Sequence, residues 1–192
     1  MCVCRDLPTW PAPDRIETPR LTLRRFVPDD APAMKALLDR HRDALATWLD
    51  LPADEEPLDR MVTRLRELAT RFETREAFHY ALVIDDRLAG ALAIEPIGGQ
   101  GLLLGGWIGP DLARRGHMRA AFDAVCRIAF MTRVTRYVEL RIRADNAPSQ
   151  RLAASLGFIH EATLSGRVIA GGAVYDETIW TLHHPSKEYA HG

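Results

Sequence analysis

The chain has 192 residues, of which 47% are hydrophobic and 27% are charged, and its formal net charge is −1. This length fits one domain with a sizeable core, and the near-zero charge gives no reason to expect attraction to nucleic acid or to a membrane surface. No apolar run reaches the ~18 residues of a membrane-spanning helix, and the N-terminus lacks the basic-then-apolar layout of a secretory signal.

The cysteines Cys2, Cys4 and Cys126 do not make a disulfide framework. Cys2 and Cys4 have no Cys/His cluster at zinc spacing beside them, so no metal site is predicted. Cys126 falls in a helical pattern and is expected to be a small buried residue. A reduced, cytoplasmic setting fits this usage.

The first third of the chain predicts one strand followed by helices. Residues 1–16 are rich in Pro and Asp and are expected to be an irregular tail. Residues 18–26 alternate apolar and polar side chains, which predicts a strand. Asp29 and Asp30 then suit the start of a helix, and residues 41–51 predict a second, short one.

A longer helix and a hairpin follow. The connector 52–57 leads into a helical stripe over 58–72, which is expected to face the core. Residues 79–84 and 88–94 are two β-rich runs joined by Asp85-Asp86-Arg87, which indicates a hairpin. Glu95-Pro96 is expected to end the second of these strands.

The central stretch of the chain is a strand, a basic turn and a helix. Residues 102–108 have the length and composition of a buried strand. Arg114-Arg115-Gly116-His117 follows, and a helical pattern begins at Met118. The first N–H groups of a helix have no intrahelical partner and carry partial positive charge, so this turn is a natural seat for phosphate. Solvated arginines at an ordinary helix start are the alternative.

The last third predicts strand, helix, strand and strand. Residues 137–142 are a strand that would run parallel to 102–108, because a helix connects the two. Residues 148–156 form a short helix that Gly157 ends. Residues 158–163 and 173–182 are the last strands, joined by Gly171-Gly172.

Three motifs in fixed order resemble those of a known family. The basic turn at Gly116 is followed by Asn146-Ala-Pro-Ser149 and by Ser155-Leu-Gly-Phe158. Over residues 17–183 the chain resembles the GNAT superfamily of acyl-CoA N-acyltransferases. Thr18-Pro-Arg-Leu-Thr-Leu-Arg24 is similar to the opening of its RimJ/RimL-type members, which acetylate protein N-termini.

The resemblance implies an α/β (α+β) GNAT fold, with a mixed central sheet of six to seven strands flanked by helices. Two parallel strands of this sheet splay apart at the cofactor site. A single N-acetyltransferase domain would span 17–183, with tails at 1–16 and 184–192. Monomer and homodimer both stay open.

The resemblance also implies a site for acetyl-CoA as donor, with no metal. The pantetheine arm would bond the backbone of Trp107-Ile108-Gly109, with the second splayed strand near 140–143. The cofactor-binding positions carried over are Trp107, Ile108, Gly109, Arg114, Arg115, Gly116, His117, Met118, Arg119, Asn146 and Ser149.

Several positions depart from the family pattern. At the phosphate turn, Ala113 replaces Gln or Arg, Arg114 replaces a common Gly, and Met118 replaces Gly or Ala. The bulk of Met118 is expected to narrow the turn. Leu103 stands where relatives often carry a glutamate base, and Ala153 where many carry a tyrosine acid.

Acyl transfer from a thioester to an amine needs a base for the amine and a proton for the leaving thiolate. Ser149 is the candidate donor to the thiolate, with a first-turn helix residue as the alternative. Glu95 is the candidate base, and the alternative is that it is a solvated residue at the end of a strand. His79 and His160 are further candidates, although a lone histidine is more often structural. Asp176 matches an acidic position of the family's final hairpin and is expected to be structural.

The sequence therefore predicts an N-acetyltransferase that moves an acetyl group from acetyl-CoA to a primary amine by direct attack in a ternary complex. A protein or peptide N-terminal α-amine is favoured as acceptor, with Trp48 and the loop 52–57 as candidate contacts. One alternative is a small-molecule amine N-acetyltransferase. The other is a non-catalytic acyl-CoA-binding regulatory module, which the missing Glu and Tyr would suit.

Overall fold

The structure is a computed structural model that describes residues 10–51, 54–131 and 134–185. Its elements follow the chain in the order β1 (Arg15–Glu17), β2 (Thr22–Arg25), η1 (Pro28–Asp30), α1 (Ala31–Arg40), α2 (Arg42–Ala46), α3 (Leu58–Glu73), β3 (Phe78–Ile84), β4 (Arg87–Ile97), β5 (Gly101–Ile108), η2 (Pro110–Leu112), α4 (His117–Met131), β6 (Tyr137–Arg143), α5 (Ala147–Ser155), β7 (Ile159–Ala170) and β8 (Ala173–His183).

The strands form a mixed sheet, which confirms the predicted fold class. Within the described residues the hydrogen-bonded order is β1-β2-β3-β4-β5-β6-β8-β7, so the sheet has eight strands instead of six to seven. β5 and β6 pair in parallel, whereas β6–β8 and β7–β8 pair antiparallel. The additional strand is β1, which pairs with β2 and buries Ile16. The expectation of irregular backbone through residue 16 is therefore wrong for Arg15 and Ile16.

The described chain divides into two compact units. The helical unit comprises residues 12–94 and 106–124, and the hairpin unit comprises residues 10–11, 95–105 and 125–185 without 132–133. The elements β4, β5 and α4 contribute residues to both units.

The helical unit is built on apolar faces at helical and strand spacing. The buried side chains recur every three to four residues in α1 and lie four and seven residues apart in α3, so each helix buries one face. A core cluster gathers Phe26, Ala31, Met34, Leu38, Leu45, Met61, Leu65 and Ala81. The hairpin β3–β4 turns through Asp85 and Asp86, which both have positive φ, as the favoured two-residue hairpin turns require.

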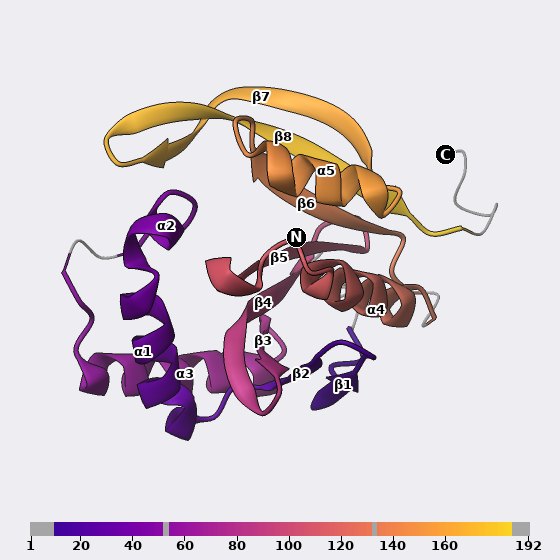
Figure 1. Cartoon of the computed structure of the whole chain (residues 1–192). Coiled ribbons are helices and arrows are strands. Elements are labelled where there is room, and N and C mark those ends of the chain that lie inside the picture. Colours follow the sequence, from indigo (N-terminus) through magenta and orange to yellow (C-terminus); the bar gives the residue numbers. More distant parts are fainter. Residues whose placement is uncertain (1–9, 52–53, 132–133, 186–192) are drawn as a thin grey trace, which may run out of the picture. The chain divides into compact units, whose positions relative to one another are not determined.

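The hairpin unit contains β6, α5 and the long hairpin β7–β8 (Figure 1). The helix α5 packs against β6 and β7. It ends at Gly157, whose φ is +86°, with Phe158 N–H bonded to Ala153 O and Gly157 N–H bonded to Ala154 O. This is the glycine-terminated helix end that the sequence predicts. Cys126 is buried, as expected.

Two strands are longer than predicted. β4 continues through Pro96 to Ile97, so Glu95 lies inside a strand and not at its end. β7 continues to Ala170 because its register shifts between Leu164 and Val168 and thereby absorbs Gly166, whose φ is +65°. Gly166 N–H donates to Asp176 Oδ1 at 2.9 Å, so the carboxylate holds this bulge and has the structural role expected of it.

Candidate functional site

In the hairpin unit, the parallel pairing of β5 and β6 stops partway along both strands. The register runs only from Gly101 opposite Tyr137 to Leu103 opposite Glu139. β6 continues to Arg143, and over its whole length it pairs with β8 on its other side. From residue 104 in β5 and residue 140 in β6 onward, the two strands are therefore no longer paired with each other. This is the interruption predicted for the two splayed strands.

In the helical unit, the turn after β5 exposes the first backbone donors of α4. The first helical hydrogen bond runs from Ala120 N–H to Gly116 O at 3.0 Å. Within the described chain, the N–H groups of Gly116, His117 and Met118 make no backbone hydrogen bond outside a regular element. Gly116 has φ +83°, a conformation that glycine adopts at little cost. The turn thus offers consecutive unbonded donors at the positive end of a helix.

Two arginines of this turn carry charge that no described carboxylate neutralises. Arg114 and Arg115 are exposed and form no ion pair within the described residues. Arg114 has φ +59°, which explains why the family favours glycine there, because a side chain in this region adds strain. His117 Nδ1 is buried without a hydrogen-bond partner among the described residues. Charge, bare N–H groups and an imidazole nitrogen together suit an anion.

The end of the Met118 side chain lies against β5. Its Cε lies 3.0 Å from the position that a Cβ of Gly106 would occupy on β5. The missing side chain at Gly106 therefore accommodates the bulk of Met118. The sequence shows Gly106 as one of two adjacent glycines in the predicted strand. It does not show that Gly106 contacts Met118, twelve positions later in the chain.

The segment Trp107–Gly109 is held on the edge that faces β4. Gly109 N–H donates to Ala89 O at 2.8 Å. A Cβ on Gly90 would lie 2.1 Å from Trp107 O, so the two backbones approach as closely as glycine allows. This contact fixes the backbone of the predicted pantetheine strand.

The start of α5 in the hairpin unit is closed by its own cap. Asn146 Oδ1 accepts the Ser149 N–H at 3.2 Å, so Asn146 is the N-cap of this helix. The Ser149 side chain is half-buried, and its hydroxyl has no hydrogen-bond partner among the described residues. Asn146 thus orders the first turn, and the Ser149 hydroxyl is available to a ligand.

The candidate bases differ in their surroundings. Glu95 is half-buried in β4 and makes no ion pair within the described residues. His79 lies in β3, and its Nε2 is buried. The His160 ring is exposed, lies 5.1 Å from the Trp180 ring and is within 3.1 Å of Thr163 Oγ1. Glu95 is thus a half-buried carboxylate without an ion pair in the described chain, which suits a proton acceptor.

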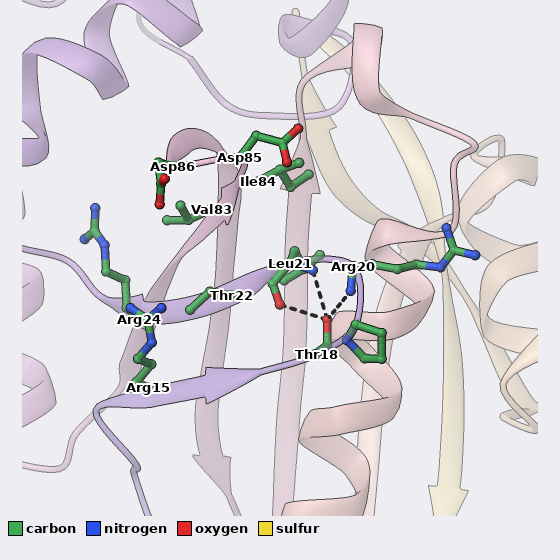
Figure 2. Close-up of a pocket in the computed structure, with 11 residues that line it drawn as sticks. Arg15, Thr18, Arg20, Leu21, Thr22, Arg24, Val83, Ile84, Asp85 and Asp86 are labelled. Atoms are coloured by element: carbon green, nitrogen blue, oxygen red, sulfur yellow. Dashed lines mark hydrogen bonds between the residues drawn. The ribbon is translucent and has the colours of Figure 1, made fainter.

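An open hollow of about 390 Å³ in the helical unit is lined by β1, β2 and the β3–β4 turn (Figure 2). Two of its arginines are already neutralised, because Arg15 pairs with Glu17 at 2.9 Å and Arg24 pairs with Asp30 at 2.6 Å. Burial alone would raise the pKa of Asp30, but hydrogen bonds from Arg24 and Val27 N–H outweigh it and hold the pKa below its ordinary value. Arg15 and Arg24 therefore offer this hollow no free charge for an anion.

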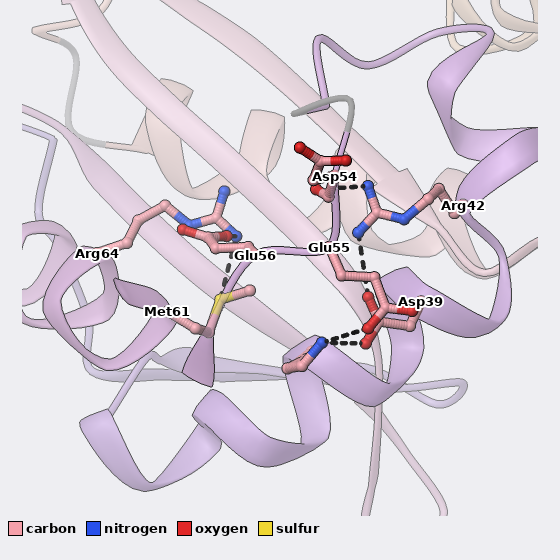
Figure 3. A network of polar contacts seen from close by, with 8 residues as sticks. Asp39, Arg42, Asp54, Glu55, Glu56, Met61 and Arg64 are labelled. Atoms are coloured by element: carbon pink, nitrogen blue, oxygen red, sulfur yellow. Dashed lines mark hydrogen bonds and ion pairs between the residues drawn. The ribbon is translucent and has the colours of Figure 1, made fainter. Parts of the chain in front are cut away.

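The candidate acceptor loop is anchored by cations of three helices (Figure 3). Arg64 pairs with the buried Glu56 at 2.9 Å, Lys35 pairs with Glu55 at 3.1 Å, and Arg42 donates to the carbonyl of Asp54 at 3.3 Å. Pro52 and Ala53 of the predicted loop lie outside the described residues. Trp48 is 44% exposed, so its ring is accessible in this unit.

Within residues 10–51, 54–131 and 134–185, no group of three or more His, Cys, Asp or Glu side chains is placed to hold a metal ion. No helix in these ranges combines the length and the apolar character needed to cross a bilayer.

An interrupted parallel strand pair and an uncapped, arginine-flanked helix start suit a transferase whose donor is an acyl-coenzyme A. The model of the acetyltransferase (GNAT) domain family matches residues 20–159, well over half of the chain. The chain therefore belongs to this family and is an acyltransferase, which confirms the predicted family and enzyme class.

Solved structures agree with this fold. MccE, the microcin C7 self-immunity acetyltransferase in complex with acetyl-CoA and AMP, superposes with a TM-score of 0.84 at 18% identity and covers 89% of this chain and 97% of its own. RimL, a ribosomal L7/L12 α-N-protein acetyltransferase in complex with CoA, gives 0.82 at 19% identity, with 88% and 97% covered. Ribosomal-protein-S5-alanine acetyltransferase from Vibrio fischeri gives 0.81 at 18% identity, with 90% and 97% covered. A search of curated protein sequences found no match.

Proposed function

We propose that this acetyltransferase moves the acetyl group of acetyl-CoA to the N-terminal α-amine of a protein or peptide. The use of acetyl-CoA as acetyl donor is supported by the turn at Gly116. There, unbonded N–H groups lie beside Arg114 and Arg115, which make no ion pair within the described residues. The acceptor half is supported by the N-terminal substrates named for the similarly folded RimL. The catalytic domain of this proposal spans residues 17–183, and its setting is the cytoplasm.

Each group of residues has its own task in this proposal. The N–H groups and side chains of 114–119 bind the diphosphate, and the backbone of Trp107–Gly109 bonds the pantetheine arm. Acetyl-CoA supplies the activated acetyl group as substrate. Direct attack by the amine requires no enzyme nucleophile, and Cys126, buried in α4, is not placed to be one.

Two side chains carry the proton movements. Glu95, directly or through a water molecule, takes the proton that the amine must lose before or during attack. The Ser149 hydroxyl donates a hydrogen bond to the sulfur as the thiolate leaves, so its effect appears only when that charge develops. Both assignments rest on the absence of competing partners for these two groups among the described residues.

The experiment that tests the function follows thiol release with acetyl-CoA and a panel of acceptors. Peptides that begin with Ser, Ala or Met are compared with the same peptides blocked by N-terminal acetylation, and with polyamines, amino acids and aminoglycosides. Release with free peptides alone supports the proposal. Release only with small amines would contradict the acceptor assignment, and tight CoA binding without release for any acceptor would contradict catalysis.

A further inference from the structure

The turn between β1 and β2 sends one arginine to the phosphate turn, both within the helical unit. Arg20 Nη1 donates to the Arg115 carbonyl oxygen at 3.1 Å, although 95 positions separate the two residues. The Arg20 atoms Cδ, Nε and Cζ lie 3.7 to 3.9 Å from the position that a Cβ of Gly116 would occupy. The Arg20 guanidinium therefore lies against the glycine of the phosphate turn.

Thr18 fixes the backbone from which Arg20 projects. Its hydroxyl accepts the N–H groups of Arg20 at 3.2 Å and Leu21 at 3.0 Å, and it donates to Leu21 O at 2.8 Å (Figure 2). The Thr18 N–H also bonds Leu21 O at 3.0 Å. In Figure 2 the Arg20 side chain extends away from Arg15 and Arg24. The turn thus holds Arg20 in a defined direction, which lowers the entropic cost of using it in binding.

The charge of Arg20 is not neutralised by any described carboxylate, in contrast to the paired Arg15 and Arg24 of the same hairpin. A guanidinium carries five N–H donors, and Arg20 uses one of them on Arg115 O. Its remaining donors and its charge add to those of Arg114 and Arg115. Unneutralised arginines beside bare backbone donors match the geometry and charge of a phosphate.

We propose that Arg20 binds a phosphate group of the coenzyme and so brings the N-terminal hairpin into the donor site. This proposal rests on the proposed function, because it concerns the same turn. The diphosphate and the ribose 3′-phosphate share the required chemistry. In either case Arg20 also holds the Arg115 carbonyl away from the anion, so that the N–H side of the turn faces it.

Calorimetric titration with coenzyme A and with dephospho-coenzyme A, which lacks the 3′-phosphate, tests the assignment. We expect Arg20→Gln to weaken coenzyme A binding by about tenfold or more, because the variant loses charge-assisted hydrogen bonds to a phosphate. Arg20→Lys should keep part of the affinity, because lysine keeps the positive charge but lacks the paired N–H donors of the guanidinium. Arg15→Gln is the matched control from the same hairpin and should bind as the wild type does.

The two ligands distinguish the phosphate. A loss with both assigns Arg20 to the diphosphate, and a loss with coenzyme A alone assigns it to the 3′-phosphate. Equal affinity of wild type and Arg20→Gln for both ligands would overturn the proposal while leaving the function intact. So would equal losses in the Gln and Lys variants, which would assign Arg20 a purely structural bond to Arg115. A wild-type protein that binds neither ligand would overturn the proposed function itself.

Discussion

The starts of α4 and α5 use the same backbone chemistry for opposite purposes. At α5, the Asn146 side chain accepts the Ser149 N–H, so the helix satisfies a donor of its first turn internally. At α4, the N–H groups of Gly116 to Met118 lack such a partner in the described structure, and arginines surround them. A helix start without a cap is costly unless a ligand or water satisfies it. The difference indicates that the start of α4 suits an anion, whereas the start of α5 positions the Ser149 hydroxyl.

The largest effect is expected from a negative charge at the α4 start. Gly116→Asp would place a carboxylate on the phosphate seat and within reach of Arg20, whose guanidinium carbon is 3.7 Å from that Cβ position. The carboxylate would repel the diphosphate and would neutralise the charge of Arg20. Together these effects should weaken coenzyme A binding on the order of 100-fold. Gly171→Asp is the matched control, because Gly171 also has positive φ, +56°, in the open β7–β8 turn. Unchanged affinity in Gly116→Asp would mean that the diphosphate binds elsewhere.

The next largest effect concerns the hydroxyl at the α5 start. Ser149→Ala should lower kcat by about 10- to 100-fold, because a hydrogen bond to the developing thiolate is lost. The affinity for coenzyme A should change little, since the Ser149 N–H that Asn146 caps is retained. Ser155→Ala on the same helix is the control, as its hydroxyl bonds the Leu152 carbonyl at 2.8 Å. Steady-state kinetics with the best acceptor measures both, and a wild-type kcat in Ser149→Ala would remove serine from the mechanism.

The short 3-10 helix η1, which precedes α1, sharpens the comparison because an ion pair within the protein stabilises its start. Asp30 accepts Val27 N–H at 3.0 Å and binds Arg24 through both carboxylate oxygens. Since the folded pKa of Asp30 is lowered, its stabilisation is present above the unfolded pKa of ~3.9 and is lost as the pH falls through the folded pKa. Asp30→Asn should cost about 1–2 kcal/mol at pH 7.

Urea denaturation at pH 7 and at pH 2–3 measures this contribution. The stability difference between wild type and Asp30→Asn should shrink at the lower pH, where the wild-type carboxyl becomes protonated. A difference that stays constant across that range would show that the charge of Asp30 contributes nothing.

The smallest effect is expected from the cap of α5. Asn146→Ala should reduce the free energy of unfolding by about 1 kcal/mol, and Asn146→Asp should retain most of the stability because Asp is an equally good cap. If the Asn146→Asp variant also keeps its activity, Asn146 contributes to activity by capping α5. A loss of coenzyme affinity in the Asp variant would instead assign the amide to direct contact with the cofactor.

The periodic elements could be predicted from the sequence because their signals are local. The spacing of apolar residues predicts both ends of α3 and the start of α4 to within two residues, and Gly157 predicts the end of α5. β1 was missed because three residues give no periodicity, and its pairing with β2 is a tertiary event.

The candidate site could be predicted only in part, for the same reason. The turn at Gly116 carries a motif, but the place where β5–β6 pairing stops is a property of two strands that are distant in sequence, and no local pattern marks it. The contacts of Met118 with Gly106 and of Arg20 with Arg115 join residues that no local pattern relates. The sequence could indicate where an anion binds, but not which distant side chains complete the turn.

The most direct test of the account is amide NMR during titration with adenosine 3′,5′-bisphosphate, which carries coenzyme-like phosphates without the pantetheine arm. We predict saturable shifts of the Gly116, His117 and Met118 amides, because their N–H groups donate to phosphate oxygens. The amides of the capped α5 start, Ala147 to Ser149, should move little. Shifts at α5 with none at Gly116 to Met118 would contradict the claim that the uncapped start of α4 is the phosphate site.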